Sequence, residues 1–219
     1  MIVHDFSKTY SVLNHFVGEL RNVEVQQDRM RFRRNLERIG EVLGYELSKT
    51  LDYQSIDIQT PLGVKPTDLL AQQPVLCTIL RAGLPLHQGM MNFFDRAETT
   101  FVSAFRHHPN GKKEFEIVVE YLATPSLENK TLIISDPMLA SGKSIANVYE
   151  VLLKQGTPRK VHIVAAIGSK PGIEYIKPQL PENAELWIAS VDDELDENQY
   201  IIPGLGDAGD LAFGEKLSK

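Results

Sequence analysis

The chain of 219 residues has one cysteine, no long apolar run and no excess of positive charge. A single cysteine excludes an internal disulfide, and the apolar run 74–80 around Cys77 predicts a buried thiol rather than a nucleophile. No stretch of about eighteen apolar residues occurs, so no membrane-spanning helix is predicted. The net charge of −6 argues against a general nucleic-acid-binding protein, which would be basic overall.

The start of the chain also lacks the basic flank and apolar centre of a secretory signal peptide. We therefore expect a cytoplasmic protein. Apolar residues make up 42% of the chain, close to the average for globular proteins, so a full core can form. The length fits one domain over 1–219, in which residues 1–50 form an N-terminal helical region.

Residues 27–50 predict a long helix that begins near Asp28. Its buried face is expected to consist of apolar residues at approximately helical spacing, Met30, Leu36, Ile39, Leu43 and Leu47. The same helix carries Arg29, Arg31, Arg33, Arg34 and Arg38. A solvated face, or ion pairs with Glu37 and Glu41, explains these arginines better than RNA contact does.

Continuous apolar runs predict strands that are covered on both faces, as in a parallel sheet, at 74–80, 131–136, 160–168 and 185–190. Helical patterns alternate with these strands over 131–190, which predicts a doubly wound, mainly parallel α/β sheet flanked by helices. Ligands of such domains bind beyond the carboxyl ends of the strands, here after Leu80 and after Ile134. Two further β-rich runs flank a Pro-Asn-Gly turn and predict an antiparallel β-arm over 99–123.

The segment 134–145, with the sequence ISDPMLASGKSI, ends in the Gly-Lys-Ser of a P-loop. A P-loop also needs a glycine five positions before Gly142, where this chain has Pro137. Proline has no N–H to donate and a fixed φ, so it cannot replace that glycine. A nucleoside-triphosphate site of the P-loop type is therefore disfavoured.

The same segment nevertheless has the features of a phosphate site. Small residues lead from the strand into a helix N-terminus, where N–H groups and the helix dipole favour an anion. Ser141 and Ser144 add hydroxyl donors and Lys143 adds a positive charge. Asp136 suits the hydroxyl groups of a sugar, so the groups together describe a ribose 5-phosphate. A plain strand–turn–helix connection with a serine N-cap explains the residues equally well, and the segment alone leaves both interpretations open.

Near the end of the chain, the sequence PGLGDAGD has the glycine spacing of a dinucleotide fingerprint at Gly204, Gly206 and Gly209. That fingerprint must open a βαβ unit of about thirty residues, and only ten residues follow Gly209. A Rossmann site is therefore excluded. Glycines allow a ligand to approach the main chain closely, so the segment suits a flat heterocycle read by backbone groups, with an ordinary turn as the alternative.

Four motifs occur in one order along the chain: LRAGL at 80–84, Arg106 at a strand end, DPMLASGKS at 136–144 and YIIPGLGDAGD at 200–210. Together they closely resemble the uracil phosphoribosyltransferase family, which has the type I phosphoribosyltransferase fold. The resemblance runs from about residue 28 to the end, and residues 1–27 carry little of it. Hypoxanthine and orotate enzymes usually have two adjacent acids where this chain has Ser-Asp before the proline of DPMLASGKS.

The resemblance implies a reaction of uracil with 5-phosphoribosyl 1-diphosphate (PRPP), which gives UMP and diphosphate and uses Mg²⁺. Arg81 and Arg106 would hold the diphosphate, and Asp136 would hold the ribose hydroxyls. Asp207 would face PRPP and its magnesium, and these four residues would be the catalytic ones. The other PRPP-binding residues would be Pro137, Met138, Leu139, Ala140, Ser141, Gly142, Lys143 and Ser144. Within a C-terminal uracil-binding segment, 192–219, the base would meet Ile201, Gly206, Asp207 and Ala208.

Three residues near the implied site depart from the family pattern. Lys143 stands where a small residue is usual, Leu211 where a basic residue is usual, and Glu215 where threonine is usual. They leave a second hypothesis open, a regulatory protein of the same fold that binds UMP or PRPP with weak catalysis. Arg81 and Arg106 favour the enzyme, since a UMP sensor needs no grip on diphosphate.

The resemblance also bears on partners. The family commonly forms homodimers or higher homo-oligomers with a β-arm that crosses to a neighbour, and 99–123 fits such an arm. Some members are activated by GTP, which makes GTP a candidate effector. We expect neither a nucleic-acid partner nor a membrane partner. The acidic run 192–197 predicts a solvated loop, with a metal site as the alternative.

Overall fold

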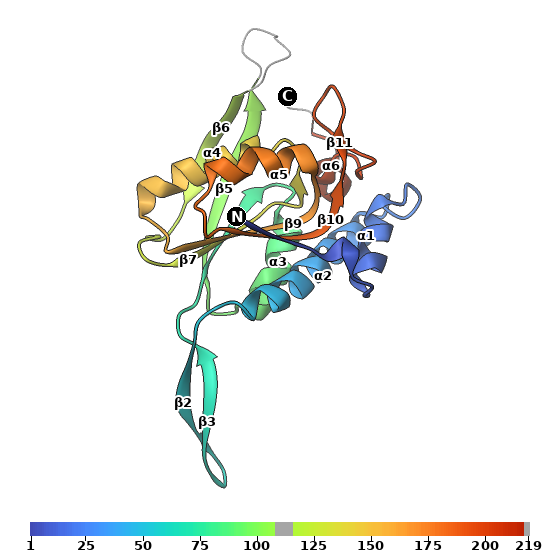
Figure 1. Cartoon of the computed structure of the whole chain (residues 1–219). Helices are drawn as coiled ribbons and strands as arrows, with labels where there is room; N and C mark the ends of the chain where they lie inside the picture. Colours follow the sequence, from blue (N-terminus) through green and yellow to red (C-terminus); the bar gives the residue numbers. More distant parts are fainter. Residues whose placement is uncertain (108–115, 217–219) are drawn as a thin grey trace.

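A central sheet of eight strands organises the protein (Figure 1). The computed structural model describes residues 1–107 and 116–216, and the side chains of 104–107 and 116–120 lie outside this description. The strands of the sheet are β1 (Ile2–Asp5), β4 (Val75–Leu80), β5 (Glu98–His107), β6 (Glu116–Ala123), β7 (Thr131–Ser135), β8 (Met138–Leu139), β9 (Lys160–Ser169) and β10 (Glu185–Asp192). Their order is β1-β10-β9-β7-β4-β5-β6, with β8 beside β9. Every pairing is parallel except that of β5 with β6.

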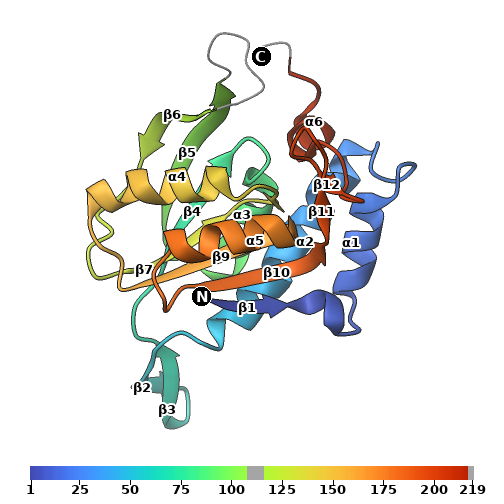
Figure 2. The ribbon, with the colours of Figure 1, turned by 45° about the horizontal axis from the view of Figure 1, so that its top comes forward.

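Helices cover both faces of this sheet (Figures 1 and 2). The helices are α1 (Leu13–Arg21), α2 (Arg29–Ser48), α3 (Leu84–Phe93), α4 (Lys143–Leu152), α5 (Lys170–Ile176) and α6 (Ala208–Phe213). Short 3-10 turns occupy Phe6–Lys8, Leu153–Gln155 and Lys177–Gln179. One hydrophobic cluster joins α1, α2 and α3 to the sheet, and a second joins α4 and α5 to its other face. The prediction of a doubly wound, mainly parallel sheet is confirmed.

The continuous apolar runs follow from this two-sided burial. In β4, Leu76 enters the cluster with α1–α3, while Val75 and Cys77 enter the cluster with α4 and α5. Successive residues of a strand point to opposite faces, so a strand covered on both sides needs apolar residues throughout. Cys77 is fully buried, and burial raises the pKa of its thiol, which confirms the prediction of an unreactive core cysteine. In the described ranges no helix has the length and apolar character needed to cross a membrane.

The predicted long helix is α2, and Asp28 caps it by accepting a hydrogen bond from the Arg31 N–H at 3.0 Å. The prediction of a buried Met30 is wrong, since this side chain is 63% exposed and Phe32 takes the inward place. Met30 lies in the first turn, at an angle that points away from the face shared by the later apolar residues. The other predicted core residues, Leu36, Ile39, Leu43 and Leu47, are all buried.

The arginines of α2 have protein partners. Arg34 pairs with Glu37 at 2.7 Å, as predicted. Arg31 binds Glu19 of α1 through two nitrogens, at 2.6 and 2.7 Å. Arg33 donates to the Ala212 carbonyl of α6 at 2.7 Å, so one arginine of this helix fixes the C-terminal segment.

The strands of the predicted β-arm do pair in antiparallel fashion, as β5 and β6. However, β5 also pairs in parallel with β4, so the two strands form the edge of the central sheet. The turn predicted between them falls on 108–115, outside the described residues. The element that projects from the body is a separate hairpin of β2 (Tyr53–Thr60) and β3 (Gly63–Leu70), which the sequence analysis did not predict (Figure 1).

His87 makes the fold sensitive to acid. Its ring is fully buried in α3, and neither ring nitrogen has a hydrogen-bond partner among the described residues. Burial lowers the pKa of His87 to about 4. Above pH 6.5 both the folded and the unfolded chain hold a neutral imidazole, whereas below it only the unfolded chain gains the proton. The His87 contribution should therefore lower the free energy of unfolding by roughly 3 kcal/mol as the pH falls from about 6.5 to about 4.

We expect His87→Leu to reduce this loss of stability, which denaturant unfolding at pH 7 and at pH 4 measures. The control is His15→Gln, because His15 is exposed on α1. Equal falls in unfolding free energy for His87→Leu and the unmodified protein would contradict the assignment.

Candidate active site

Two loops meet where β4 and β7 end, at the carboxyl edge of the sheet. Thr78 of β4 lies opposite Ser135 of β7, and the Ser135 hydroxyl donates to the Cys77 carbonyl at 3.0 Å. A Cβ added to Gly83, just after β4, would lie 3.1 Å from the Ser135 carbonyl oxygen. The loop that carries Arg81 therefore packs against the end of β7, directly before Asp136.

Asp136 begins the predicted phosphate segment. Its N–H donates to the Val164 carbonyl at 3.1 Å, and its carboxylate accepts from the Met138 N–H at 3.3 Å. The next carbonyl, of Pro137, accepts from the N–H groups of Ala166 and Ile167. These bonds continue β9 pairing past the end of β7, so the segment predicted as a loop contains the short strand β8.

The structure separates the residues of this segment by orientation. Pro137, Leu139 and Gly142 are buried, and Leu139 belongs to the core cluster beside α4 and α5. Met138 and the residues Ala140, Ser141, Lys143 and Ser144 are partly exposed. The buried members shape the segment, and the partly exposed members are the ones whose side chains can face a ligand.

The N-terminus of α4 carries no side-chain cap among the described residues. Its N-cap residue is Gly142, with a left-handed φ of 77°, and its first turn has no acidic residue. The interpretation as a plain connection with a serine N-cap therefore loses its main support. An uncapped helix start with a neighbouring lysine and two serines retains its preference for an anion.

Helix α5 supports the segment from behind. Ser169 caps α5 by accepting from the Gly172 N–H at 2.9 Å, and its hydroxyl donates to the Ala140 carbonyl at 2.7 Å. One hydroxyl thus links the start of α5 to the middle of the phosphate segment. Sequence reasoning missed this role, because a serine before Lys-Pro-Gly indicates only a helix cap.

Arg81 faces the C-terminal segment. Its guanidinium donates to Asp210 at 3.1 Å, and a Cβ added to Gly209 would lie 3.8 Å from the same nitrogen atom. Asp207 caps α6 by accepting from the Asp210 N–H at 3.0 Å, and its other oxygen lies 3.6 Å from Lys216. The structure thereby places Arg81 beside the first turn of α6, which Asp207 caps, and it adds Asp210, which sequence reasoning missed.

Arg106 is placed by its backbone alone, because its side chain lies outside the description. It pairs with Ile117 near the end of β5. Ser103 of β5 lies opposite Leu80, the last residue of β4, so Arg106 stands three residues beyond it at the same edge of the sheet. His107 follows it in β5, and the side chain of His107 also lies outside the description.

The predicted base-binding segment is a compact turn after β12 (Ile201–Ile202), which pairs with β11 (Glu194–Leu195). Ile201 and Ala208 are almost completely buried. Gly204 has a left-handed φ of 59°, and a Cβ there would lie 2.1 Å from the Ile201 carbonyl oxygen. Only glycine fits this position, because any Cβ would clash with that carbonyl oxygen. Leu211, a departure from the family pattern, is partly buried against the core, and Glu215 is exposed.

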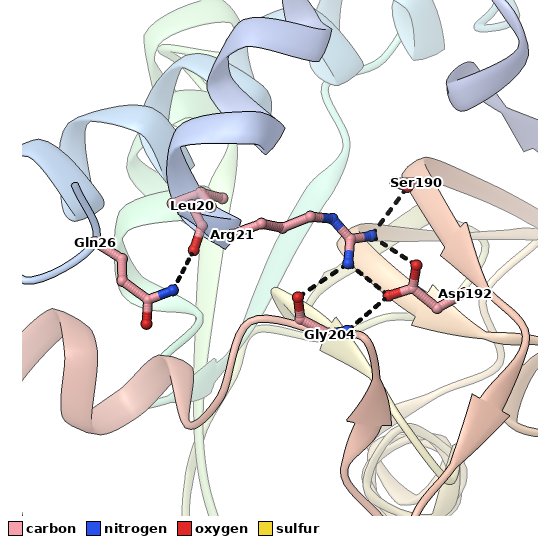
Figure 3. Close-up of polar contacts among 6 residues, drawn as sticks. All are labelled: Leu20, Arg21, Gln26, Ser190, Asp192 and Gly204. Atoms are coloured by element: carbon pink, nitrogen blue, oxygen red, sulfur yellow. Dashed lines mark hydrogen bonds and ion pairs between the residues drawn. The ribbon is translucent and has the colours of Figure 1, made fainter. Parts of the chain in front are cut away.

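The prediction that 192–197 forms a solvated loop is wrong at its start. Asp192 ends β10, is 9% exposed, and pairs with Arg21 of α1 at 2.7 Å (Figure 3). Glu194 belongs to β11. Asp193 is exposed and pairs with Lys170. In the part of the chain that the structure describes, no group of three or more histidine, cysteine, aspartate or glutamate residues could hold a metal ion.

This arrangement can bind a phosphorylated sugar and a flat base side by side. The uncapped N-terminus of α4, the carboxylate of Asp136 and the guanidinium of Arg81 lie on loops from the same sheet edge. Helix α6, which follows the Gly204 turn, contacts this edge through the bond of Arg81 to Asp210. Asp207 and Asp210 are two carboxylates within one helical turn beside Arg81, and Mg²⁺ is usually held by one or two carboxylates together with substrate phosphates.

Known proteins resemble this chain over nearly its whole length. The family model described as uracil phosphoribosyltransferase matches residues 8–215. A protein named uracil phosphoribosyltransferase from Porphyromonas gingivalis is 50% identical over 208 residues, which cover 95% of this chain and 96% of that protein. One of the same name from Pyrococcus furiosus is 38% identical, covering 91% and 84%.

A solved structure supports the same relationship. The AQ2163 protein from Aquifex aeolicus is 29% identical and superposes with a TM-score of 0.86, covering 99% of this chain and 100% of that one. With these matches and the geometry above, the chain belongs to the uracil phosphoribosyltransferase family, of the type I phosphoribosyltransferase fold.

Proposed function

We propose that the protein is an enzyme that transfers the phosphoribosyl group of PRPP to uracil, releasing UMP and diphosphate. One observation carries this proposal: the α4 N-terminus, Arg81 and the Gly204 turn converge on one edge of the sheet. Relatives of 38–50% identity bear the name of this enzyme. A regulator without turnover is not favoured, since those relatives are named as enzymes and since a UMP sensor would not need Arg81 to bind diphosphate.

The phosphoribosyl group is held from two sides in this proposal. The α4 N-terminus, Ser141 and Ser144 donate to the 5-phosphate, and Lys143 adds positive charge. Asp136 accepts hydrogen bonds from the ribose hydroxyls. Breaking the bond between C1 and the diphosphate leaves an oxocarbenium-like ribose, so the sugar must be positioned before that bond breaks.

Arg81 and Arg106 stabilise the negative charge that grows on the departing diphosphate. Such fixed charges contribute most where the site excludes water. In the present state Arg81 is paired with Asp210, so an incoming diphosphate competes with that carboxylate. Mg²⁺, when bound through the diphosphate and Asp207, would neutralise part of the same charge.

Uracil is read by main-chain groups in this proposal, around Ile201, Gly206 and Ala208. An N–H directed at a carbonyl oxygen of uracil would face the amino group of cytosine and remain unpaired, which rejects cytosine. The N1 of uracil bonds to C1 of the ribose as the bond from C1 to the diphosphate breaks, and the N1 proton passes to the released diphosphate or to water. We assign no side chain as the base for that proton.

The proposal is tested by UMP formation from labelled uracil with PRPP and Mg²⁺, with cytosine, hypoxanthine and orotate in parallel. We expect product from uracil only. Asp136→Asn should abolish most of the activity, whereas Asp193→Asn, a control at an exposed carboxylate, should retain it. No product from any base, together with tight binding of UMP or PRPP, would refute the enzyme and favour the regulator. Adding GTP to the same assay tests whether GTP, the candidate effector, raises the rate of UMP formation.

We further propose that the chain is a cytoplasmic homo-oligomer and that the β2–β3 hairpin, rather than 99–123, reaches a second copy. The hairpin stands away from the body (Figure 1), and a two-stranded hairpin alone is only marginally stable in water. Ile56, Ile58 and Leu69 lie on one of its faces, and all three are exposed. An exposed apolar face on a projecting element is typical of an interface between subunits.

The double variant Ile56→Lys/Ile58→Lys is expected to shift the protein to the monomer, because two charges would be buried in that interface. Light scattering after size-exclusion chromatography measures the mass. Val64→Lys is the control, since Val64 is exposed on the opposite face of the hairpin. An unchanged mass for the double variant would refute the role of the hairpin.

A further inference from the structure

Arg21 connects the beginning of the chain to its end. It is the last residue of α1, within the range 8–215 that the family model matches, so the prediction that residues 1–27 carry little of the resemblance is wrong from residue 8 onward. Its guanidinium binds both carboxylate oxygens of Asp192, at 2.7 and 2.9 Å, across 171 residues of sequence (Figure 3). The two side chains are only 21% and 9% exposed. A two-pronged arginine–carboxylate pair with this burial holds its partners in one geometry.

Gly204 is the third member of this group. Its carbonyl accepts from Arg21 at 2.9 Å, and its N–H donates to Asp192 at 3.2 Å (Figure 3). Both polar groups of one residue in the base-binding turn are therefore bound to the ion pair. Ser190 completes the arrangement by accepting from Arg21 at 3.1 Å.

The α1 end of this group is itself fixed. Leu13, Val17 and Leu20 of α1 are buried in the core, and the Gln26 side chain donates to the Leu20 carbonyl at 3.0 Å (Figure 3). Gln26 is 8% exposed, so this bond is sheltered from water. Arg21 therefore extends from a helix end that is packed into the core and held independently of the turn.

The position of Gly204 controls the groups that are proposed to read uracil. Gly204 lies between Ile201 and Gly206 in the chain, and both its N–H and its carbonyl are bonded to the Arg21–Asp192 pair. Main-chain N–H and C=O groups cannot rotate independently of the turn that carries them. A displacement of about 1 Å in such a positioning element can cost about 100-fold in rate.

We propose that Arg21 and Asp192 act as a clamp that positions the uracil-binding turn, which makes Arg21 a positioning residue for base recognition. This inference rests on the proposed function for the identity of the base. It assigns to the N-terminal segment a part in recognition of the base and none in recognition of PRPP.

Kinetics of Arg21→Lys test the clamp. Lysine keeps the charge but has a single ammonium that cannot bind both carboxylate oxygens and the Gly204 carbonyl in the same way. We expect the uracil KM to rise about tenfold or more while the PRPP KM changes by less than about twofold. Asp192→Asn should give the same pattern. Ser190→Ala, which removes one acceptor only, should raise the uracil KM about threefold.

Arg31→Lys is the matched control. Arg31 makes a similar two-pronged pair with Glu19, also on α1, but it does not contact the turn. If Arg21 has a merely structural role, Arg21→Lys and Arg31→Lys should both lower the melting temperature and the active fraction, and both should leave the uracil KM unchanged. That result would overturn the proposal.

Hydrogen–deuterium exchange separates this inference from the proposed function. The Gly204 N–H is bonded to Asp192, so Arg21→Lys and Ser190→Ala should speed exchange within 201–207, and Arg31→Lys should not. This readout needs no activity. If the unmodified protein forms no UMP, the proposed function fails, but faster exchange in Arg21→Lys and Ser190→Ala still supports the clamp. Unchanged exchange in both of these variants refutes the clamp, whatever the activity.

Discussion

Arg81→Ala is expected to lower kcat for UMP formation by about 10²–10³-fold, which corresponds to roughly 3–4 kcal/mol of transition-state stabilisation. The guanidinium stands on the loop after β4 and contacts α6 through Asp210 at 3.1 Å. It is therefore placed between the sugar side and the base side of the site. Charge on the diphosphate grows as the bond to C1 breaks, so a fixed cation there stabilises the transition state more than the bound substrate.

Steady-state kinetics with both substrates varied measure this effect. The control is Arg159→Ala, because Arg159 has a comparable exposure and also pairs with an aspartate, Asp52 at 2.8 Å. It lies next to the first residue of β9, at the end of that strand away from the carboxyl edge. The control should change kcat by less than about twofold, because Arg159 lies away from the carboxyl edge of the sheet. Loss of its ion pair should also leave the fold intact, since surface ion pairs contribute little to stability. A loss below about fivefold in Arg81→Ala would show that Arg81 does not act on the leaving group.

The strand and the helix start of segment 131–144 could be predicted because they are contiguous in the sequence. The strand, the small residues and the start of α4 follow one another within 131–144, so local rules apply to all of them. Pro137 excluded a P-loop on the same local grounds, and its carbonyl indeed serves the β9 backbone rather than a ligand. What the local rules did not reveal is β8, since a two-residue strand has too little pattern to detect.

The contacts that support the site could not be predicted, because they join distant segments. Arg21 and Asp192 are separated by 171 residues, and a run of acids predicts a solvated loop when its partner is unknown. Ser169 reaches Ala140 across 29 residues. Each of these residues carries an ordinary local signal, as a helix end, a charge run or a helix cap, and its second role depends on the tertiary fold.

The hairpin was missed for a different reason. The segment Tyr53–Leu70 has no buried face, and its apolar alternation is limited to Ile56 and Ile58, which is too short to predict a strand. It also contains Pro66, which argues against a central strand. The β5–β6 pair shows the converse: its pairing could be predicted from the turn, but its place in the central sheet depends on β4.

Gly142→Ala is expected to raise the KM for PRPP by about 100-fold. An alanine at a left-handed φ of 77° costs roughly 1–2 kcal/mol of strain in any surroundings. The added Cβ would also lie 2.5 Å from the Ile176 side chain and 2.8 Å from the Gly172 carbonyl oxygen, both on α5. Because α5 holds the Ala140 carbonyl through Ser169, relief of the clash has to move the α4 N-terminus or the phosphate segment.

Substrate kinetics and calorimetric binding of PRPP measure the change, with Gly18→Ala as the control. A Cβ at Gly18 meets no atom within 4 Å, and Gly18 lies inside α1, where alanine should be neutral or slightly stabilising. The uracil KM at saturating PRPP should stay within about threefold in Gly142→Ala, because the Gly204 turn is held separately by Arg21. If PRPP binds Gly142→Ala as tightly as the unmodified protein, the 5-phosphate is held elsewhere. If the uracil KM rises as much as the PRPP KM, the two halves of the site are coupled through more than the sheet edge they share.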